Sequence, residues 1–322
     1  MIDMNLHNFD YYLKGLSGGK DSTAAFLWLV YESGLPVSKI RAVCCDTGNE
    51  DPITYAYLAM LTELTGVPIN YLVPQFKGED TDFYKLALSK GAFPARRSQF
   101  CTEFLKVRVL TNHTFDLCKK GRVLHISSIR KAEGKADNNR GNLNIFGEGA
   151  IINEWKYRPI YNWDLDKIKA IHNKYIPMDV IKTLLIEYGN LGQYFDEVWQ
   201  RIDSPMNPLY SMGCSRVGCF PCINAKKGEF LALSRYRPEK ADEIHETEKA
   251  IGKSFVHRNT TPKRFWSMET KNKKGGVYMA PSIYDTMTWA NTLRGAKLPM
   301  FEFAKVHEIE HGSLCSMAGL CE

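Results

Sequence analysis

The sequence predicts an α/β protein in which helices flank a parallel sheet and a mostly helical, loop-rich C-terminal extension follows. Two segments predict the sheet. Tyr11–Ser17 is a short strand-like run that passes through a glycine pair into a helical pattern ending near Gly34. The run 40–45 is strand-like and precedes a turn and a second helical pattern. Between 230 and 251, apolar residues at helical spacing predict the helical part of the extension.

Composition and charge limit the class of protein. The chain has 322 residues, of which 44% are hydrophobic and 24% charged, a balance typical of one large globular domain or two modest ones. The net charge of +6 permits an anionic partner such as a nucleotide or a nucleic acid. The first residues lack the apolar region of a signal peptide, and the longest apolar run, 24–31, is too short to span a bilayer. A cytoplasmic protein without a membrane partner is therefore expected.

A glycine-rich loop marks the junction of the first strand and helix. Its hexapeptide is Ser17-Gly18-Gly19-Lys20-Asp21-Ser22. Glycines allow the backbone to approach an anion, and the free amides of a helix start attract it. The kinase-type phosphate loop is excluded, because Lys14 stands where that loop needs its first glycine and Asp21 follows the lysine. The alternative is an ordinary glycine turn before a helix.

The hexapeptide resembles the pyrophosphate loop of the ATP pyrophosphatase superfamily, which includes GMP synthetase, tRNA thiolases and the phosphoadenosine phosphosulfate (PAPS) reductase family. The segment Asp46-Thr47-Gly48, with Pro52 and Thr54, is similar to the segment after the second strand in PAPS reductase-like proteins. The resemblance implies an adenine nucleotide alpha hydrolase-like (PP-loop) fold that binds ATP or PAPS. It implies adenylation with pyrophosphate release, with Lys20, Asp21 and Asp46 as catalytic candidates. Asp46 is also a candidate contact for a magnesium ion.

Two later segments extend the resemblance. "SSIRKAEGKADNNR" is similar to the family's G-I-R-x-x-E-S…R motif and places Arg130, Glu133 and Arg140 at its charged positions, with Ser128 replacing the glycine. These three residues are predicted nucleotide contacts, because a guanidinium fork binds phosphate or sulfate oxygens. A solvated surface is the alternative. Arg158, Pro159 and Trp163 resemble the family's next motif, in which Trp163 is expected to be structural.

The cysteines predict a metal centre. The spacing of Cys214, Cys219 and Cys222, with Gly and Pro between them, is typical of a loop folded around a metal. Three thiolates need a fourth ligand, for which Cys101 is the best candidate; it is expected in a loop before a helix, beside Arg96 and Arg97. The resemblance favours a [4Fe–4S] cluster, with zinc or unligated thiols as alternatives.

The other cysteines fall into two groups. Cys44, Cys45 and Cys118 are expected to pack as small buried apolar groups, while Cys315 and Cys321 of the tail are candidates for a redox or sulfur-relay role.

Three segments are predicted: a nucleotide-binding core over 1–163, a helical insertion with the cysteine loop over 164–229, and the extension over 230–322. "NPLYSMGCSRVGCFPC" is most similar to the iron–sulfur adenylating subunit of DNA phosphorothioation systems. That implies an ATP-dependent enzyme that transfers sulfur to DNA or tRNA, supplied by a cysteine desulfurase or another sulfur donor protein.

Two alternatives stay open: a PAPS or adenylyl-sulfate reductase, and a nucleotide-sensing or nucleic-acid-binding protein without catalysis. A basic, aromatic stretch in the extension offers candidate contacts for a nucleic acid backbone and its bases. They are Lys263, Arg264, Phe265, Trp266, Lys271, Lys273 and Lys274. A solvated basic loop explains the same residues equally well.

Overall fold

The computed structural model describes residues 6–95, 98–131, 144–271 and 275–292. Its centre is a six-stranded sheet in the order β3-β2-β1-β6-β8-β7, in which every neighbouring pair is parallel except β7 with β8. The strands are β1 (Tyr11–Gly15), β2 (Ile40–Cys45), β3 (Ile69–Leu72), β6 (Val123–Ile126), β7 (Phe146–Glu148) and β8 (Glu154–Tyr157). The predicted α/β fold with a mainly parallel sheet is confirmed.

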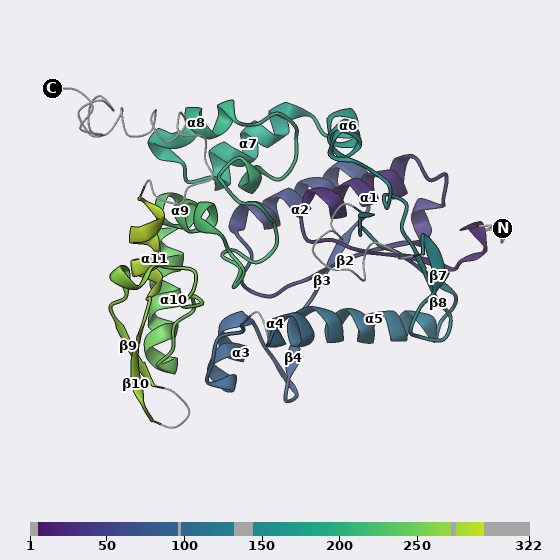
Figure 1. The fold of residues 1–322 in the computed structure, drawn as a ribbon. Helices are drawn as coiled ribbons and strands as arrows, with labels where there is room; N and C mark the ends of the chain where they lie inside the picture. Colours follow the sequence, from purple (N-terminus) through teal and green to yellow (C-terminus); the bar gives the residue numbers. More distant parts are fainter. Residues whose placement is uncertain (1–5, 96–97, 132–143, 272–274, 293–322) are drawn as a thin grey trace.

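Helices cover both faces of this sheet (Figure 1). On one face lie α1 (Lys20–Tyr31) and α2 (Pro52–Thr65), and α5 (Arg108–Cys118) lies on the other. A second layer covers the first two helices: α6 (Leu165–Tyr175) packs on α1, and α7 (Met178–Tyr188) packs on α2 and precedes α8 (Phe195–Gln200). Three α-helices thus lie between Leu165 and Gln200.

Short elements connect β3 to α5. They are the hairpin of β4 (Gln75–Phe76) and β5 (Glu79–Asp80), α3 (Phe83–Lys90), and α4 (Phe100–Thr102), which runs through one π-helical turn (103–107) into α5. Cys101 therefore lies within a helix, and the prediction of a loop there was wrong. The apolar spacing of Phe100, Phe104 and Leu105 with α5 keeps this segment helical against the core.

The C-terminal part is mostly helical, as predicted. It contains α9 (Lys227–Tyr236), α10 (Pro238–Ile251), α11 (Ile283–Ala290) and a hairpin of β9 (Met268–Lys271) with β10 (Val277–Ala280), which was not predicted. The single helix expected over 230–251 is broken at Arg237, because Pro238 has no amide to continue α9 but fits the first position of α10.

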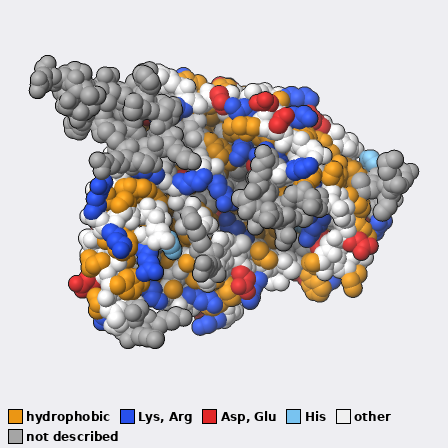
Figure 2. Space-filling model, viewed as in Figure 1, with side chains coloured by type: hydrophobic (Ala, Val, Ile, Leu, Met, Phe, Trp, Pro, Cys, Tyr) orange, Lys and Arg blue, Asp and Glu red, His pale blue; other side chains and the backbone are white. Residues whose placement is uncertain are grey.

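One apolar core joins these parts. Its buried side chains extend from Phe9 to Ala290 and link the α1–α2 face of the sheet to α7, α9, α10 and α11. A smaller cluster lies under α5. None of the described helices combines the length and apolarity needed to cross a membrane. On the face in Figure 2, Lys and Arg side chains outnumber Asp and Glu side chains, in keeping with the net charge of +6.

A buried ion pair ties the C-terminal helices to the sheet. Arg237 Nε and Nη2 each lie 2.9 Å from an oxygen of Asp51, and the side chains are 3% and 0% exposed. Asp51 also caps α2 by accepting the Ile53 amide at 2.9 Å. The remaining Arg237 protons go to the carbonyls of Tyr188, Gly189 and Tyr236. Every charge in this cluster is thus hydrogen-bonded.

Replacing Arg237 should strongly destabilise the protein. Arg237→Met leaves the Asp51 carboxylate buried without its partner, so the free energy of unfolding should fall by about 3–5 kcal/mol. Urea titration followed by circular dichroism measures this loss. Lys249→Met, which breaks an exposed pair with Glu246, is the control and should change stability little. A loss in Arg237→Met no larger than in this control would contradict the role given to the pair.

Glu248 should give the stability a pH dependence of its own. Its side chain is fully buried and accepts the amides of Phe255 (2.8 Å) and Ile283 (3.1 Å), and burial raises its pKa from 4.5 to about 7. The folded state therefore binds the proton of the Glu248 carboxyl more tightly than the unfolded state does. The stability that this proton contributes is fully present below pH 4.5 and is lost as pH rises through 7. Thermal melts of Glu248→Gln should show its stability relative to wild type increasing from pH 5 to pH 8. A constant difference would contradict this assignment.

Candidate nucleotide site

The loop between β1 and α1 has the backbone of an anion-binding turn. Gly18 has φ +70°, which favours glycine, and Gly19 is the extended N-cap of α1 and offers no side chain to cap it. Ser22 Oγ donates to the Gly19 carbonyl at 2.9 Å and lies 3.4 Å from the Ser17 amide. The loop is therefore held in shape by its own serines, and Gly19 leaves the helix start without a side-chain cap of its own.

Arg130 binds Asp21 at this loop. Its Nε lies 2.6 Å from Asp21 Oδ1, and its Nη1 reaches the Trp163 carbonyl at 3.5 Å. The Lys20 ammonium lies 3.6 Å from the same carboxylate. The guanidinium predicted to face an anion is thus largely occupied by an acidic residue, so contact with a nucleotide stays a prediction for Arg130. Glu133 and Arg140 lie outside the described residues.

The turn after β2 is internally bonded, with Thr47 and Asn49 buried, Asp46 half-buried and Gly48 exposed. Asp46 Oδ1 accepts from the Gly48 amide (3.0 Å) and from the Tyr55 hydroxyl (2.6 Å). Thr47 Oγ1 donates to Glu50 at 2.8 Å. Gly48 has φ +66°, and a Cβ there would lie 2.7 Å from Asp82 Cβ. Parallel β1 and β2 bring this turn and the Ser17–Ser22 loop to one edge of the sheet.

The cysteine loop returns to the same edge. The Phe220 amide donates to the Asn49 carbonyl at 2.6 Å, and Asn49 Nδ2 donates to the Pro221 carbonyl at 3.2 Å. These bonds place Cys219 Sγ 3.3 Å from Thr47 Oγ1. Burial raises the pKa of the Cys219 thiol, and the nearby Lys106 ammonium opposes that rise.

The four predicted metal ligands are only partly brought together. Burial raises the pKa of the Cys101 thiol, and the charges of Cys219 and Cys222 raise it further, so these three thiols share one neighbourhood. Cys214 is buried elsewhere, where Glu229, Asp51 and Arg237 are the charged groups that act on it. Within the described ranges, no three His, Cys, Asp or Glu side chains are arranged to hold a metal ion. The thiols as placed do not fit the predicted four-thiolate centre.

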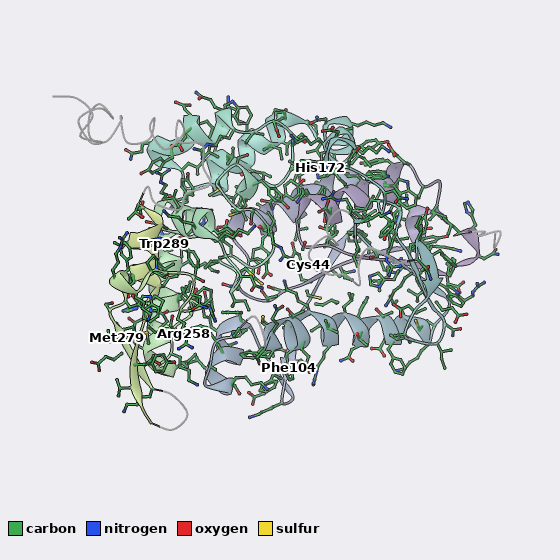
Figure 3. The ribbon with its side chains drawn as sticks, in the orientation of Figure 1. Cys44, Phe104, His172, Arg258, Met279 and Trp289 are labelled. Atoms are coloured by element: carbon green, nitrogen blue, oxygen red, sulfur yellow. The ribbon has the colours of Figure 1, made fainter. Side chains whose placement is uncertain are left out.

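The remaining described cysteines, Cys44, Cys45 and Cys118, differ in burial. Cys44 and Cys118 are buried, as expected, and Figure 3 shows Cys44 within the central sheet. Cys45 is only partly buried, with its Sγ 3.7 Å from the Lys106 carbonyl. Cys315 and Cys321 lie outside the described residues.

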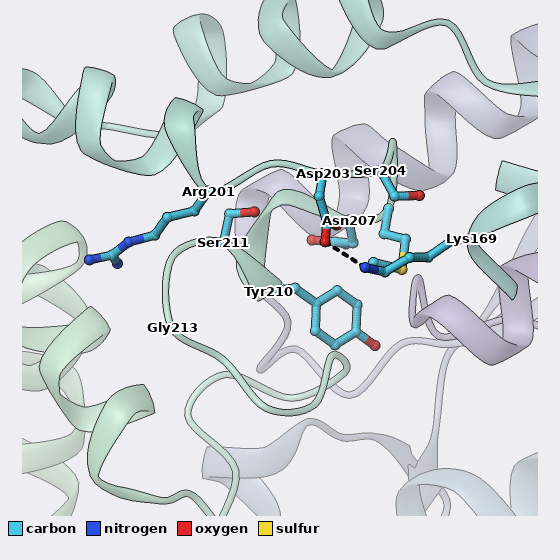
Figure 4. Close-up of a pocket in the computed structure, with 9 residues that line it drawn as sticks. Lys169, Arg201, Asp203, Ser204, Asn207, Tyr210, Ser211 and Gly213 are labelled. Carbon is cyan, nitrogen blue, oxygen red and sulfur yellow. Dashed lines mark hydrogen bonds and ion pairs between the residues drawn. The ribbon is translucent and has the colours of Figure 1, made fainter. Parts of the chain in front are cut away.

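Two hollows flank the loop. One, of about 220 Å³, lies between the ends of β1 and β2 and α5; it is lined by Gly15, Leu16, Ser17, Val43, Cys44, Cys45, Glu50, Lys106, Val107 and Leu110. The other, of about 310 Å³, is lined by Lys169, Arg201, Asp203, Ser204, Met206, Asn207, Tyr210, Ser211 and Gly213 (Figure 4). The first has mostly apolar walls and the second is lined mainly by polar side chains.

Tyr210 joins the second hollow to the loop. Its hydroxyl accepts the Lys20 amide at 3.0 Å, and the Lys20 ammonium lies 5.1 Å from the centre of its ring. Asn207 and Val217 approach Gly18 from the same segment. The segment 207–217 therefore covers the loop. Sequence reasoning missed Tyr210, although the run "NPLY" just before the cysteine loop was a usable signal.

The basic stretch of the extension is partly folded. Lys263–Phe265 form one 3₁₀ turn, the Trp266 indole donates to the Thr261 carbonyl at 2.8 Å, and Arg264 lies 4.9 Å from the centre of the Phe265 ring. Lys271 ends β9, and Lys273 and Lys274 lie outside the described residues. Both aromatic rings have protein contacts, so their role as stacking platforms for bases stays a prediction.

Comparisons with known proteins give only distant similarities. No family model matches the chain. A protein of Escherichia phage 186, named as an uncharacterized 37.8 kDa protein in the gpa 5' region, is 25% identical over 356 aligned positions covering 95% of each chain. Two solved structures are similar at lower identity. PAPS reductase from Candida auris, in a phosphate complex, has a TM-score of 0.44 and 15% identity, over 68% of this chain and 85% of that one. FMN adenylyltransferase from Candida glabrata, with FAD and pyrophosphate, has a TM-score of 0.30 and 12% identity, over 50% and 47%. None of them assigns an activity to this chain.

Removing the Tyr210 hydroxyl should improve anion binding at the loop. Tyr210→Phe keeps the ring beside Lys20 but frees the Lys20 amide for a ligand. Since one neutral hydrogen bond contributes about 0.5–1.5 kcal/mol, affinity for pyrophosphate should rise roughly two- to tenfold. Isothermal titration calorimetry measures the change, with Tyr284→Phe, whose hydroxyl binds Asp242 in the C-terminal part, as the control. Weaker binding in Tyr210→Phe would mean that the hydroxyl itself contacts the anion.

Proposed function

We propose that this protein binds an adenine nucleotide at the Ser17–Ser22 loop and cleaves it between the α- and β-phosphates. The observation that carries the proposal is the glycine-rich start of α1, where the Tyr210 hydroxyl occupies the Lys20 amide that a ligand would take. It combines a positive-φ Gly18, an uncapped Gly19 and the Lys20 ammonium at the carboxyl edge of a parallel sheet. The apolar hollow beside Gly15 and Val43 would take the base, since aromatic rings favour such walls.

The proposed chemistry is adenylyl transfer. An acceptor oxygen attacks the α-phosphorus of ATP, and the bond to the pyrophosphate oxygen breaks. Lys20 and the amides of the loop would stabilise the charge that develops on the leaving pyrophosphate. Asp21 is held by Arg130 and Asp46 by Tyr55, so each carboxylate is fixed in direction beside this site. Asp46 is the better candidate for a magnesium contact, because no Lys or Arg pairs with it among the described ion pairs.

The finer proposal is sulfur transfer to DNA or tRNA. A sulfur nucleophile from a donor protein would displace AMP from the adenylated acceptor. The position of Cys219 beside Thr47 supports this, because it puts a thiol at the nucleotide edge of the sheet. The [4Fe–4S] or zinc centre stays a proposal from resemblance alone. No step depends on it, and anaerobic purification with iron, sulfide and zinc assays tests it.

A PAPS or adenylyl-sulfate reductase is the second candidate, and the same thiol favours it. In that reaction a thiolate attacks the sulfur of the sulfonucleotide and the nucleotide phosphate leaves, after which a reductant releases sulfite. Pyrophosphate release from ATP distinguishes adenylyl transfer, and sulfite release from PAPS with a dithiol distinguishes reduction. Release of neither product, with intact nucleotide binding, would favour a nucleotide-sensing protein.

Lys20→Ala should weaken nucleotide binding. A charge-assisted contact contributes about 1.5–3 kcal/mol, so affinity for ATP should fall roughly ten- to hundredfold. Calorimetric titration of ATP measures the loss, and Lys85→Ala, an exposed lysine on α3, is the matched control. Equal affinity in Lys20→Ala and wild type would remove the loop from the binding site.

A further inference from the structure

Lys14 is a fully buried cation with no acidic partner in the part of the chain that the structure describes. Its side chain is among the largest fully buried ones, and the residue is 1% exposed. Its Nζ donates to the Gly15 carbonyl at 2.8 Å and to Ser128 Oγ at 2.6 Å. No ion pair of Lys14 occurs among the described residues, unlike the other buried cations Arg130 and Arg237. A buried, unpaired ammonium is costly to fold and calls for a function.

The place of this cation in the fold is the point where ligands bind in open α/β sheets. From β1 the chain proceeds to β2 and β3 on one side, whereas β6 lies on the other side of β1. Ligands occupy the crevice outside the carboxyl ends of the strands at such a switch point. Lys14 lies near the end of β1 and Ser128 just beyond the end of β6, so their hydrogen bond links the carboxyl ends of these two strands. The Ser17–Ser22 loop begins three residues later.

Ser128 can connect Lys14 to a ligand through hydrogen bonds. Its oxygen accepts a hydrogen bond from the ammonium, which leaves the hydroxyl hydrogen available to donate to an anion. Ser128 is only partly buried, unlike Lys14. Ser128 also occupies the position of the glycine in the G-I-R-x-x-E-S…R motif, so this chain has a hydroxyl where that motif has no side chain.

We propose that Lys14 and Ser128 form a second cationic subsite, which binds a tetrahedral oxyanion of the nucleotide at the crevice between β1 and β6. Ser128 contacts the anion, and Lys14 is the positioning residue that directs and polarises its hydroxyl. This inference rests on the proposed nucleotide binding and extends it, since it assigns an anion contact on the side of β1 away from β2.

Of the charged groups on the strands and loop beside Lys14, Arg41 of β2 donates to the carbonyls of Ser38 and Ile40, and the others contact a group of opposite charge. His125 and Lys156 each lie 3.5 Å from Glu154, and Asp21 is bound by Arg130 and Lys20. Burial lowers the pKa of Lys14 to about 7. An anion favours the charged lysine, so binding should take up a proton near and above pH 7, and the benefit of Lys14 should decrease from pH 7 to pH 9.

The experiment uses the full chain and calorimetric titration with ATP, pyrophosphate, sulfate and adenosine. Lys14→Met keeps the length of the side chain without its charge, Ser128→Ala removes only the contacting hydroxyl, and Lys85→Met is the control. At pH 7, Lys14→Met should bind ATP at least about tenfold more weakly and Ser128→Ala severalfold more weakly, with adenosine binding unchanged. The melting temperature of Lys14→Met should equal or exceed that of wild type, because a buried charge is removed. Pyrophosphate and sulfate show which oxyanion the subsite prefers.

Two results would overturn the inference. One is unchanged ATP affinity and unchanged proton uptake in Lys14→Met, measured in buffers of different ionisation enthalpy. The other is a lowered melting temperature with equal losses for ATP and adenosine, which would make Lys14 a structural residue. Wild-type protein that binds neither ATP nor pyrophosphate would instead refute the proposed function itself.

Discussion

The buried pair of Asp51 and Arg237 is the interaction on which the rest of the site depends. Asp51 follows the turn after β2 and caps α2, while Arg237 sits at the break between α9 and α10 and bonds the carbonyls that end α7. One guanidinium thus fixes three helices to the edge of the sheet that carries the loop. Its planar fork suits this task, because each of its donors meets a separate acceptor.

That attachment has consequences at the loop itself. The segment between α8 and α9 passes the starts of α1 and α2 before it enters α9, which ends beside Arg237. Tyr210 then meets the Lys20 amide, and Cys219 meets Thr47. The cover over the loop and the thiol at the edge of the sheet come from one segment.

Local patterns were enough to predict the central fold. The loop between β1 and α1 and the turn after β2 depend on glycine conformations and strand–helix alternation, which are local properties of the chain. The partners of charged residues were not predictable in this way. Arg130 was expected to face an anion, but Asp21 lies 109 positions away in sequence and only 2.6 Å away in space. Cys214 and Cys219 are close in sequence, yet different charged groups act on their thiols: Glu229, Asp51 and Arg237 on Cys214, and Lys106 and Glu50 on Cys219.

The burial of Lys14 could not be predicted from the sequence pattern. A lysine in a strand is ordinarily assigned to the solvent face, and its burial becomes visible only when β6 and Ser128 are placed beside β1. The same placement explains why the residue is tolerated. Two hydrogen bonds reduce the cost of burying the amine, and a lowered pKa lets it lose its charge when no anion is present. A buried lysine at this position is therefore stable when neutral and binds an anion when charged, whereas arginine, which stays protonated, would lack the first state.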